Sequence, residues 1–194
     1  MNWAIWVTGP PGSGKTTLAR GVAAALEARG VALKVLELDE VRKVVTPAPI
    51  YSETERDIVY RALAYMAKLL TEAGVPVIVD ATAHRRAWRE LARSLISAFA
   101  EVQLLCPIEV CREREQRRRP GYAPPAIYAR AGIPGATVPG VDVAYEVSPR
   151  AELTLNTDEG DLWTQIQEVL YVVRRLSRVA VFQELRLQRR FICE

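Results

Sequence analysis

Short apolar runs alternate along the chain with longer segments in which apolar residues recur at helical spacing. The first apolar run, 3–7, has no charged or hydroxyl side chain, which is typical of a strand buried on both faces. Strands that alternate with helices predict an α/β fold with a five-stranded parallel sheet and helices on both of its faces. The predicted strands are 3–7, 33–38, 75–80, 102–106 and 153–155, and the predicted helices are 17–29, 52–73, 85–100, 108–118 and a last one from about 161.

The loop after the first strand, 9–16, has the sequence Gly-Pro-Pro-Gly-Ser-Gly-Lys-Thr, which fits the phosphate-binding pattern G-x-x-x-x-G-K-[ST]. Its glycines let successive backbone N–H groups face one point, and the next helix adds its positive N-terminus. A plain glycine-rich turn would not explain a Lys-Thr pair at the start of a helix. We therefore predict ATP binding, with Lys15 on the β- and γ-phosphates and the Thr16 hydroxyl on Mg²⁺. The predicted nucleotide-binding residues of this loop are Gly9, Gly12, Ser13, Gly14, Lys15, Thr16 and Thr17.

Two charged residues follow the second predicted strand. Asp39 stands at the carboxyl end of that strand, and Arg42 lies one helical turn later, on the same face. A carboxylate there would face the γ-phosphate and orient or deprotonate an acceptor hydroxyl, while the arginine would hold an acceptor anion. The alternative is structural: Asp39 caps a helix and pairs with Arg42. Next to a phosphate-binding loop, we favour the functional interpretation.

Asp80 ends the third predicted strand, in the position of a Walker B carboxylate that supports Mg²⁺. It would equally serve as a cap for the helix that begins near Arg85, and the two roles are compatible. Ligands of parallel sheets bind at the carboxyl ends of the strands. The phosphate-binding loop, 39–42 and 80–85 all fall at such ends, so we expect them to form one cleft.

The segment 118–148 is rich in proline and glycine, and we interpret it as a lid over this cleft. Arginines on a mobile lid neutralise charge on a transferring phosphoryl group and exclude water. Among the arginines that precede the lid, Arg114 is the one we expect to touch nucleotide; a solvated helix face would account for most of the others. His84 is the only histidine, and we do not predict a catalytic role for it. Arg85 and Arg89, one turn apart, would form either an anion site or a solvated face, and Tyr122, Tyr128 and Tyr145 would stack on a base or pack the lid down.

Composition limits the class of protein without changing this picture. The chain has 194 residues, 49% hydrophobic and 25% charged, with a net charge of +3, as expected for a single globular domain spanning 1–194. Three cysteines without C-x-x-C spacing indicate reduced thiols and no metal site, so we expect a cytoplasmic protein. The first strand leaves no room for a signal peptide, and no apolar run is long enough to span a membrane. A homodimer is one assembly that the sequence allows.

Five segments resemble the adenylylsulfate kinases, P-loop enzymes that move phosphate from ATP to the 3′-hydroxyl of adenosine 5′-phosphosulfate. The resemblance runs from the phosphate-binding loop to about Thr157, and the most specific part is Gly-Val-Asp-Val-Ala-Tyr-Glu at 140–146, followed by Pro149. Generic P-loop kinases lack that run. The other segments are Leu-Asp-Glu-Val-Arg at 38–42, Tyr-Ser-Glu-Thr-Glu-Arg at 51–56, Thr-Ala-His-Arg at 82–85 and Pro-Ile-Glu-Val-Cys-Arg-Glu-Arg at 107–114.

The resemblance implies roles for residues around the acceptor. Lys15, Asp39 and Arg42 would act in catalysis, with Arg42 on the phosphosulfate and Tyr51 stacked on the purine. The chain departs from the family pattern at Val59, where the family has asparagine, and at Val138, where it has an aromatic residue. Taken together, the residues that we expect to bind the acceptor are Asp39, Arg42, Tyr51, Arg56 and Arg85.

Three hypotheses about function follow. The first is an adenylylsulfate kinase that uses ATP and Mg²⁺ and a small-molecule acceptor. The second is a related kinase for another hydroxyl, either in a small metabolite or at the 5′ end of a polynucleotide; a basic groove beside the cleft would favour the polynucleotide. The third is a switch that binds and hydrolyses nucleotide. A switch needs no acceptor pocket, whereas Asp39, Arg42 and the lid suggest one.

Overall fold

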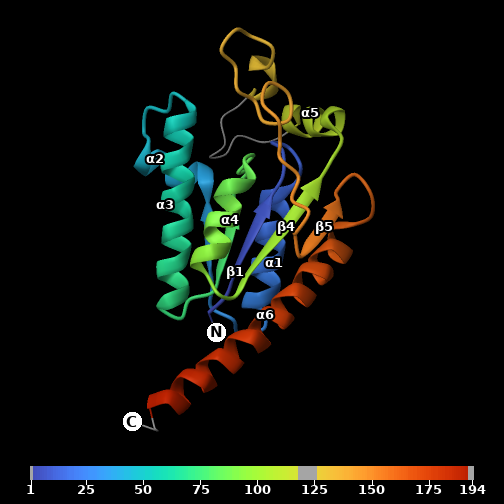
Figure 1. Ribbon diagram of the computed structural model, residues 1–194. Coiled ribbons are helices and arrows are strands. Elements are labelled where there is room, and N and C mark those ends of the chain that lie inside the picture. Colours follow the sequence, from blue (N-terminus) through green and yellow to red (C-terminus); the bar gives the residue numbers. More distant parts are fainter. Residues whose placement is uncertain (1, 118–125, 192–194) are drawn as a thin grey trace.

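The protein is described by a computed structural model that covers residues 2–117 and 126–191, with side chains through residue 177 (Figure 1). Five parallel strands form one sheet in the order β2-β3-β1-β4-β5, which confirms the predicted α/β class and strand number. The strands are β1 Ala4–Thr8, β2 Lys34–Glu37, β3 Val77–Asp80, β4 Phe99–Leu105 and β5 Leu153–Asn156. The helices are α1 Lys15–Glu27, α2 Leu38–Val45, α3 Glu53–Glu72, α4 Arg86–Leu95, α5 Ile108–Gln116 and α6 Leu162–Phe191, with a short 3₁₀ turn at Tyr128–Arg130.

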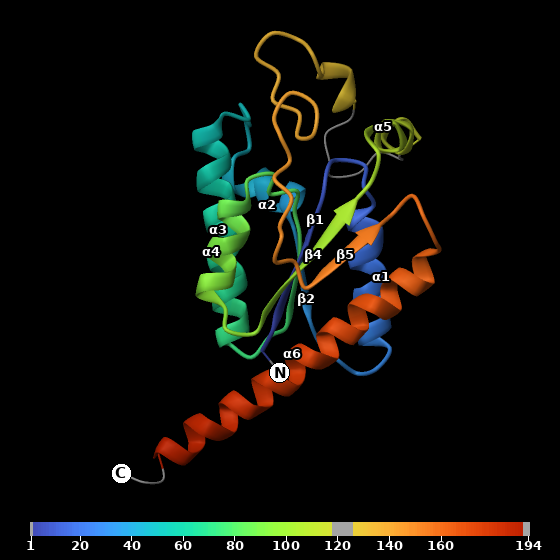
Figure 2. The ribbon, with the colours of Figure 1, turned by 45° about the vertical axis from the view of Figure 1, so that its right-hand side comes forward.

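Alternate side chains of β1 enter two separate cores. Trp3, Ile5 and Val7 pack with α1 and the first half of α6. Ala4 and Trp6 face the other way and pack with α3 and α4. Figure 2 shows these two helix layers on opposite sides of the sheet. Because β1 is central and covered on both faces, all five of its residues are buried, and its apolar sequence follows from that position.

Two predicted boundaries were wrong. The helix predicted over 85–100 ends at Leu95, and β4 begins at Phe99 instead of residue 102. Phe99 and Ala100 align with Ala4 and Ile5 of β1, so pairing in the sheet outweighs the local helical periodicity. The last helix begins at Leu162, and its first turn is capped by Asp161, whose carboxylate accepts a hydrogen bond from the Thr164 N–H at 2.9 Å.

Residues 126–148 of the predicted lid lie above the carboxyl ends of the strands (Figure 1). Its first part, 118–125, which includes Tyr122, is outside the described residues. The remaining part is held by contacts within the lid and by contacts to the sheet. The Asp142 carboxylate accepts from the N–H groups of Gly132 and Val138, at 2.8 and 2.9 Å. Further on, the Tyr145 and Thr8 hydroxyls lie 3.0 Å apart, which fastens the lid to the end of β1. None of the described helices is long and apolar enough to cross a membrane.

Candidate active site

The phosphate-binding loop joins β1 to α1 and is held in a conformation that needs glycine. Gly12 has φ +77°, and a Cβ atom there would lie 2.4 Å from the carbonyl oxygen of Cys111 in α5. Gly14, also left-handed with φ +95°, is the residue from which α1 starts. The backbone of the loop therefore curls at the N-terminus of α1, where N–H groups and the helix dipole favour an anion.

Lys15 lies over this loop. Its Nζ donates to the carbonyl oxygens of Gly9 and Pro10, at 3.1 and 2.8 Å. Behind the loop, the Thr157 hydroxyl donates to the Ser13 carbonyl at 2.9 Å. The Ser13 side chain is buried, and its hydroxyl has no hydrogen-bond partner among the described residues. Thr157 thus supports the loop on one side, and the Lys15 amino group lies against its carbonyl groups.

Thr16 and Asp80 meet although 64 positions separate them in the chain. The Thr16 hydroxyl donates to Asp80 Oδ2 at 2.6 Å. Burial raises the pKa of the Asp80 carboxyl, and Lys15 and Thr16 counteract part of that effect. Asp80 does not cap α4, because that helix starts from Arg85 without a side-chain cap. The structural alternative for Asp80, capping of that helix, is therefore wrong. The Thr16 hydroxyl and the Asp80 carboxylate lie together beside the phosphate-binding loop.

A pocket of about 260 Å³ opens next to the loop and contains most of the predicted acceptor residues. Its wall includes Pro11 of the loop together with Asp39, Arg42, Tyr51 and Arg56. Asp39 lies in the first turn of α2, which begins at Leu38 directly after β2, so Asp39 is not the N-cap. Two chain segments around residues 39 and 56 therefore meet the phosphate-binding loop in one hollow.

Both predicted arginines of this pocket are buried and oriented by neighbours. Arg42 lies 2.7 Å from Glu55 Oε1 and stacks over the Tyr51 ring, with 5.1 Å between the guanidinium carbon and the ring centroid. Arg42 thus pairs with Glu55, whereas the structural alternative had Asp39 as its partner. Arg56 donates to the carbonyl oxygens of Tyr51 and Thr137, at 3.1 and 2.8 Å. Such contacts fix the direction of each guanidinium.

The lid contributes pocket residues that sequence reasoning missed. Thr137 is one of them: its hydroxyl accepts from Arg56 at 2.7 Å. Ile127 and Arg130 also line the pocket, and so does Val138, which the sequence had already marked as a departure from the family pattern. The only signal in the sequence was the unusual length of the proline- and glycine-rich segment, since nothing in its periodicity shows which residues point inward.

Two predicted binding residues lie away from the pocket wall. Arg85 is half-exposed and pairs with Glu53 at 2.7 Å. Arg114 donates to the carbonyl oxygen of Thr157 at 2.6 Å and thus tightens the contact behind the phosphate-binding loop. Arg85 therefore does not line the pocket of the other predicted acceptor residues. Arg114 supports the phosphate-binding loop from behind through Thr157, and its contact with nucleotide stays a prediction.

Arg89 corrects another expectation, because it forms neither an anion site nor a solvated face. It is fully buried and lies 2.8 Å from Glu101 Oε1 in β4. Its other nitrogens donate to the carbonyl oxygens of Ala83 and Glu146, and its guanidinium faces the Tyr145 ring. The segment from Gly140 to Glu146 ends on this buried cation, so Arg89 anchors the lid to α4 and the sheet. A glutamate inside an apolar strand was the available signal.

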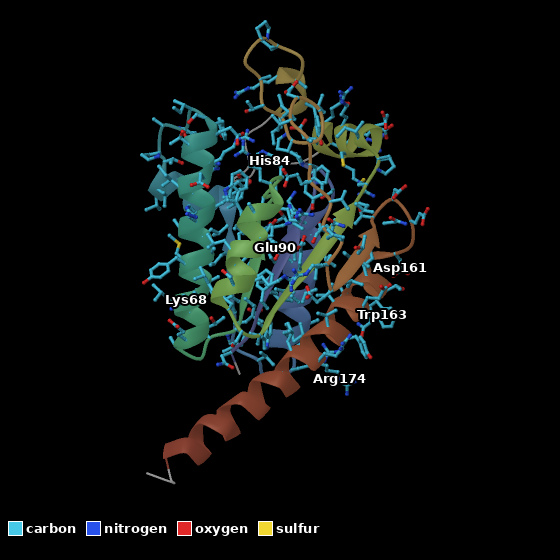
Figure 3. All side chains as sticks on the ribbon, viewed as in Figure 1. Lys68, His84, Glu90, Asp161, Trp163 and Arg174 are labelled. Carbon is cyan, nitrogen blue, oxygen red and sulfur yellow. The ribbon has the colours of Figure 1, made fainter. Side chains whose placement is uncertain are left out.

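His84 is a buried neutral neighbour of the pocket (Figure 3). Burial, together with the nearby Arg56, lowers its pKa to about 4. Its Nδ1 lies 3.4 Å from an Arg56 nitrogen and is oriented to accept from it. A neutral imidazole there helps to hold Arg56.

Comparison with known proteins connects this site to a family. The family model described as "Adenylylsulphate kinase" matches residues 1–156. A probable adenylyl-sulfate kinase from Archaeoglobus fulgidus is 38% identical over 164 residues, covering 83% of this chain and 99% of that protein. An adenylyl-sulfate kinase from Picosynechococcus is 34% identical over 178 residues, covering 90% and 95%. Among solved structures, the Mycobacterium tuberculosis APS kinase in complex with AMPPNP and APS superposes with a TM-score of 0.77, at 29% identity, covering 89% of this chain and 98% of that one.

Proposed function

Because the chain belongs to the adenylylsulfate kinase family of ATP-dependent kinases, we propose that it moves the γ-phosphate of ATP to the 3′-hydroxyl of adenosine 5′-phosphosulfate. The observation that carries this proposal is the pocket beside the phosphate-binding loop. It brings Asp39 and two buried arginines next to Pro11 of the loop. A hydroxyl acceptor with an anionic group fits that combination, because the carboxylate can face the hydroxyl while the arginines hold the anion.

The transfer itself requires one bond to form and one to break. The 3′-hydroxyl oxygen forms a bond to the γ-phosphorus, the bond from that phosphorus to the β–γ bridging oxygen breaks, and ADP leaves. Asp39 orients the hydroxyl and accepts its proton. The Lys15 amino group donates to the loop carbonyls in the structure. When nucleotide binds, it turns from these carbonyls to the β- and γ-phosphates. The loop N–H groups hold the remaining phosphate oxygens.

Thr16 and Asp80 have the donor types that Mg²⁺ prefers. Mg²⁺ in kinases is usually held by one or two protein oxygens together with substrate phosphates. The hydroxyl and carboxylate oxygens, 2.6 Å apart beside the loop, fit that pattern. When bound, Mg²⁺ would neutralise negative charge on the phosphate oxygens. Asp80 would hold the Thr16 hydroxyl in place next to the bound Mg²⁺.

The acceptor's parts can be assigned to the pocket. The Tyr51 ring offers a stacking face for a purine, and the buried Arg42 beside it supplies positive charge for the phosphosulfate. Val138 covers the pocket with an aliphatic group where the family pattern has an aromatic ring. With one stacking partner instead of two, the acceptor should bind more weakly than in a kinase that has both, since base–aromatic stacking is worth about 1–3 kcal/mol per base.

The experiment is an ADP-release assay with adenosine 5′-phosphosulfate, a 5′-hydroxyl oligonucleotide and common hydroxyl metabolites as parallel acceptors. We expect stoichiometric ADP and a 3′-phosphorylated product with adenosine 5′-phosphosulfate. Tyr51→Ala should raise its apparent KM roughly tenfold to a hundredfold. The matched control is Tyr65→Ala, because Tyr65 is an exposed tyrosine of α3 that does not line the pocket. Arg42→Ala should raise the KM as well.

Two results would decide for the rival hypotheses. No turnover at millimolar adenosine 5′-phosphosulfate together with turnover of another hydroxyl would favour a related kinase with a different acceptor. ATP hydrolysis that no acceptor accelerates would favour a nucleotide-hydrolysing switch. An unchanged KM in both Tyr51→Ala and Arg42→Ala would show that the acceptor binds elsewhere.

A further inference from the structure

A second, larger pocket lies at the opposite end of the sheet from the lid. It has a volume of about 760 Å³, within the range typical of small-molecule sites. Its walls are the start of β1, the end of α1 and the middle of α6, and its apolar lining includes Trp3, Leu26, Leu170 and Val173. Figure 3 shows Arg174 on α6 at this end of the molecule, far from the lid.

The charged side chains that line this pocket are all positive. Arg29 and Arg174 both line it, and no carboxylate does. Neither arginine forms an ion pair with an acidic side chain in the part of the chain that the structure describes. Arg29 uses one nitrogen for the carbonyl oxygen of Ala25 at 2.5 Å. The rim therefore presents two positive groups next to an apolar wall.

Trp3 adds a hydrogen-bond donor to the same place. Its side chain is fully buried and lines the pocket, and its indole N–H has no hydrogen-bond partner among the described residues. A buried donor without a partner is costly, and buried polar groups are normally paired. The indole N–H is thus a polar point in an otherwise apolar wall of the pocket.

The α6 side of the pocket lies outside the family match. The family model ends at residue 156, whereas Leu170, Val173 and Arg174 come after it. The pocket is also remote from the phosphate-binding loop, at the amino ends of the strands. The pocket is therefore separate from the phosphate-binding cleft, and an inference from it does not depend on the proposed function.

We propose that this pocket is a second binding site for an amphipathic organic anion, with an aliphatic or aromatic body and one carboxylate or sulfonate group. The body would pack against Trp3, Leu26 and Leu170, and the anionic group would lie at the rim between Arg29 and Arg174. Each part of the ligand thus meets the side chains that suit it: apolar surface is removed from water inside, and charge is neutralised where solvent still reaches.

The test uses the full chain with saturating ATP·Mg²⁺, so that the phosphate-binding cleft is filled. The fluorescent probe is 8-anilinonaphthalene-1-sulfonate, an aromatic sulfonate. We expect saturable binding with one probe per chain and displacement by octanoate. Octan-1-ol, which has the same chain length without the charge, should displace the probe at least about fivefold less effectively, the factor that corresponds to one ion contact of about 1 kcal/mol.

Two neighbouring residues provide the matched variants. Arg174 lines the pocket, whereas Arg175 is the next residue of α6, is also exposed and does not line it. Arg174→Gln should weaken probe and octanoate binding roughly fivefold, and Arg175→Gln should leave both unchanged. Arg29→Gln should act as Arg174→Gln does. Three results would each overturn the proposal. The first is an equal effect of Arg174→Gln and Arg175→Gln, and the second is equal displacement by octanoate and octan-1-ol. The third is no saturable binding because a second copy of the chain covers this face.

Discussion

Protonation of His84 should destabilise the protein as the pH falls. The imidazole is buried, and its Nδ1 lies 3.4 Å from a nitrogen of Arg56, which itself lines the acceptor pocket. Arg85 faces it as a further positive charge, while Glu53 and Glu146 act in the opposite direction. Burial and Arg56 prevail and lower the pKa of His84 from 6.5 to about 4. A proton would therefore be forced into a buried site next to a cation.

The sign and size follow from proton linkage. Between the folded pKa near 4 and the unfolded pKa of 6.5, the unfolded chain binds more protons, so stability is lost as the pH falls through this window. Each pKa unit corresponds to about 1.4 kcal/mol, which limits the whole effect to about 3 kcal/mol. Integration from pH 7 to pH 5 assigns about 2 kcal/mol of that loss to this interval.

The assay compares the wild type with His84→Gln by urea unfolding at pH 7 and pH 5. Asp80 and Glu101, whose pKa values burial raises, titrate in both proteins, so their contributions cancel in the difference between the two. The free energy of unfolding of the wild type relative to the variant should fall by about 2 kcal/mol between the two pH values. A change below about 0.5 kcal/mol, comparable to the extrapolation error, would refute the reasoning.

Three further predictions concern the phosphate-transfer residues. Lys15→Ala should abolish measurable transfer with an unchanged far-UV spectrum, because water can replace the Nζ hydrogen bonds to the Gly9 and Pro10 carbonyls; normal turnover in the folded variant would contradict its role. Asp39→Asn should lower kcat roughly 10²- to 10⁴-fold with unchanged ATP affinity in a nucleotide titration, and a loss of ATP binding instead would make it a structural or metal-supporting residue. Asp80→Asn should raise the melting temperature of the nucleotide-free protein at pH 7, because burial disfavours the charged carboxylate at any pH above its unfolded pKa. The same variant should have lower activity at limiting Mg²⁺. A lower melting temperature would be inconsistent with the raised pKa of Asp80.

Local chemistry determined the parts of the site that lie within one short stretch of sequence. The phosphate-binding loop could be recognised because its conformation depends on glycine at positions such as Gly12, where a Cβ would strike the Cys111 carbonyl. The positions of Asp39 and Asp80 at strand ends also followed, since a buried apolar run shows where its strand stops. The parallel sheet was predictable for the same reason: five apolar runs alternated with amphipathic helices.

Only the tertiary structure decided which distant residues share a surface. Arg42 pairs with Glu55 instead of Asp39, Thr137 of the lid reaches Arg56, and Arg89 is buried against Glu101 instead of facing solvent. These contacts depend on how α2, α3, α4 and the lid pack around the sheet. A single sequence specifies backbone preference and hydrophobic period over a few residues, whereas the partner of a charged side chain is selected by packing and desolvation across the whole fold.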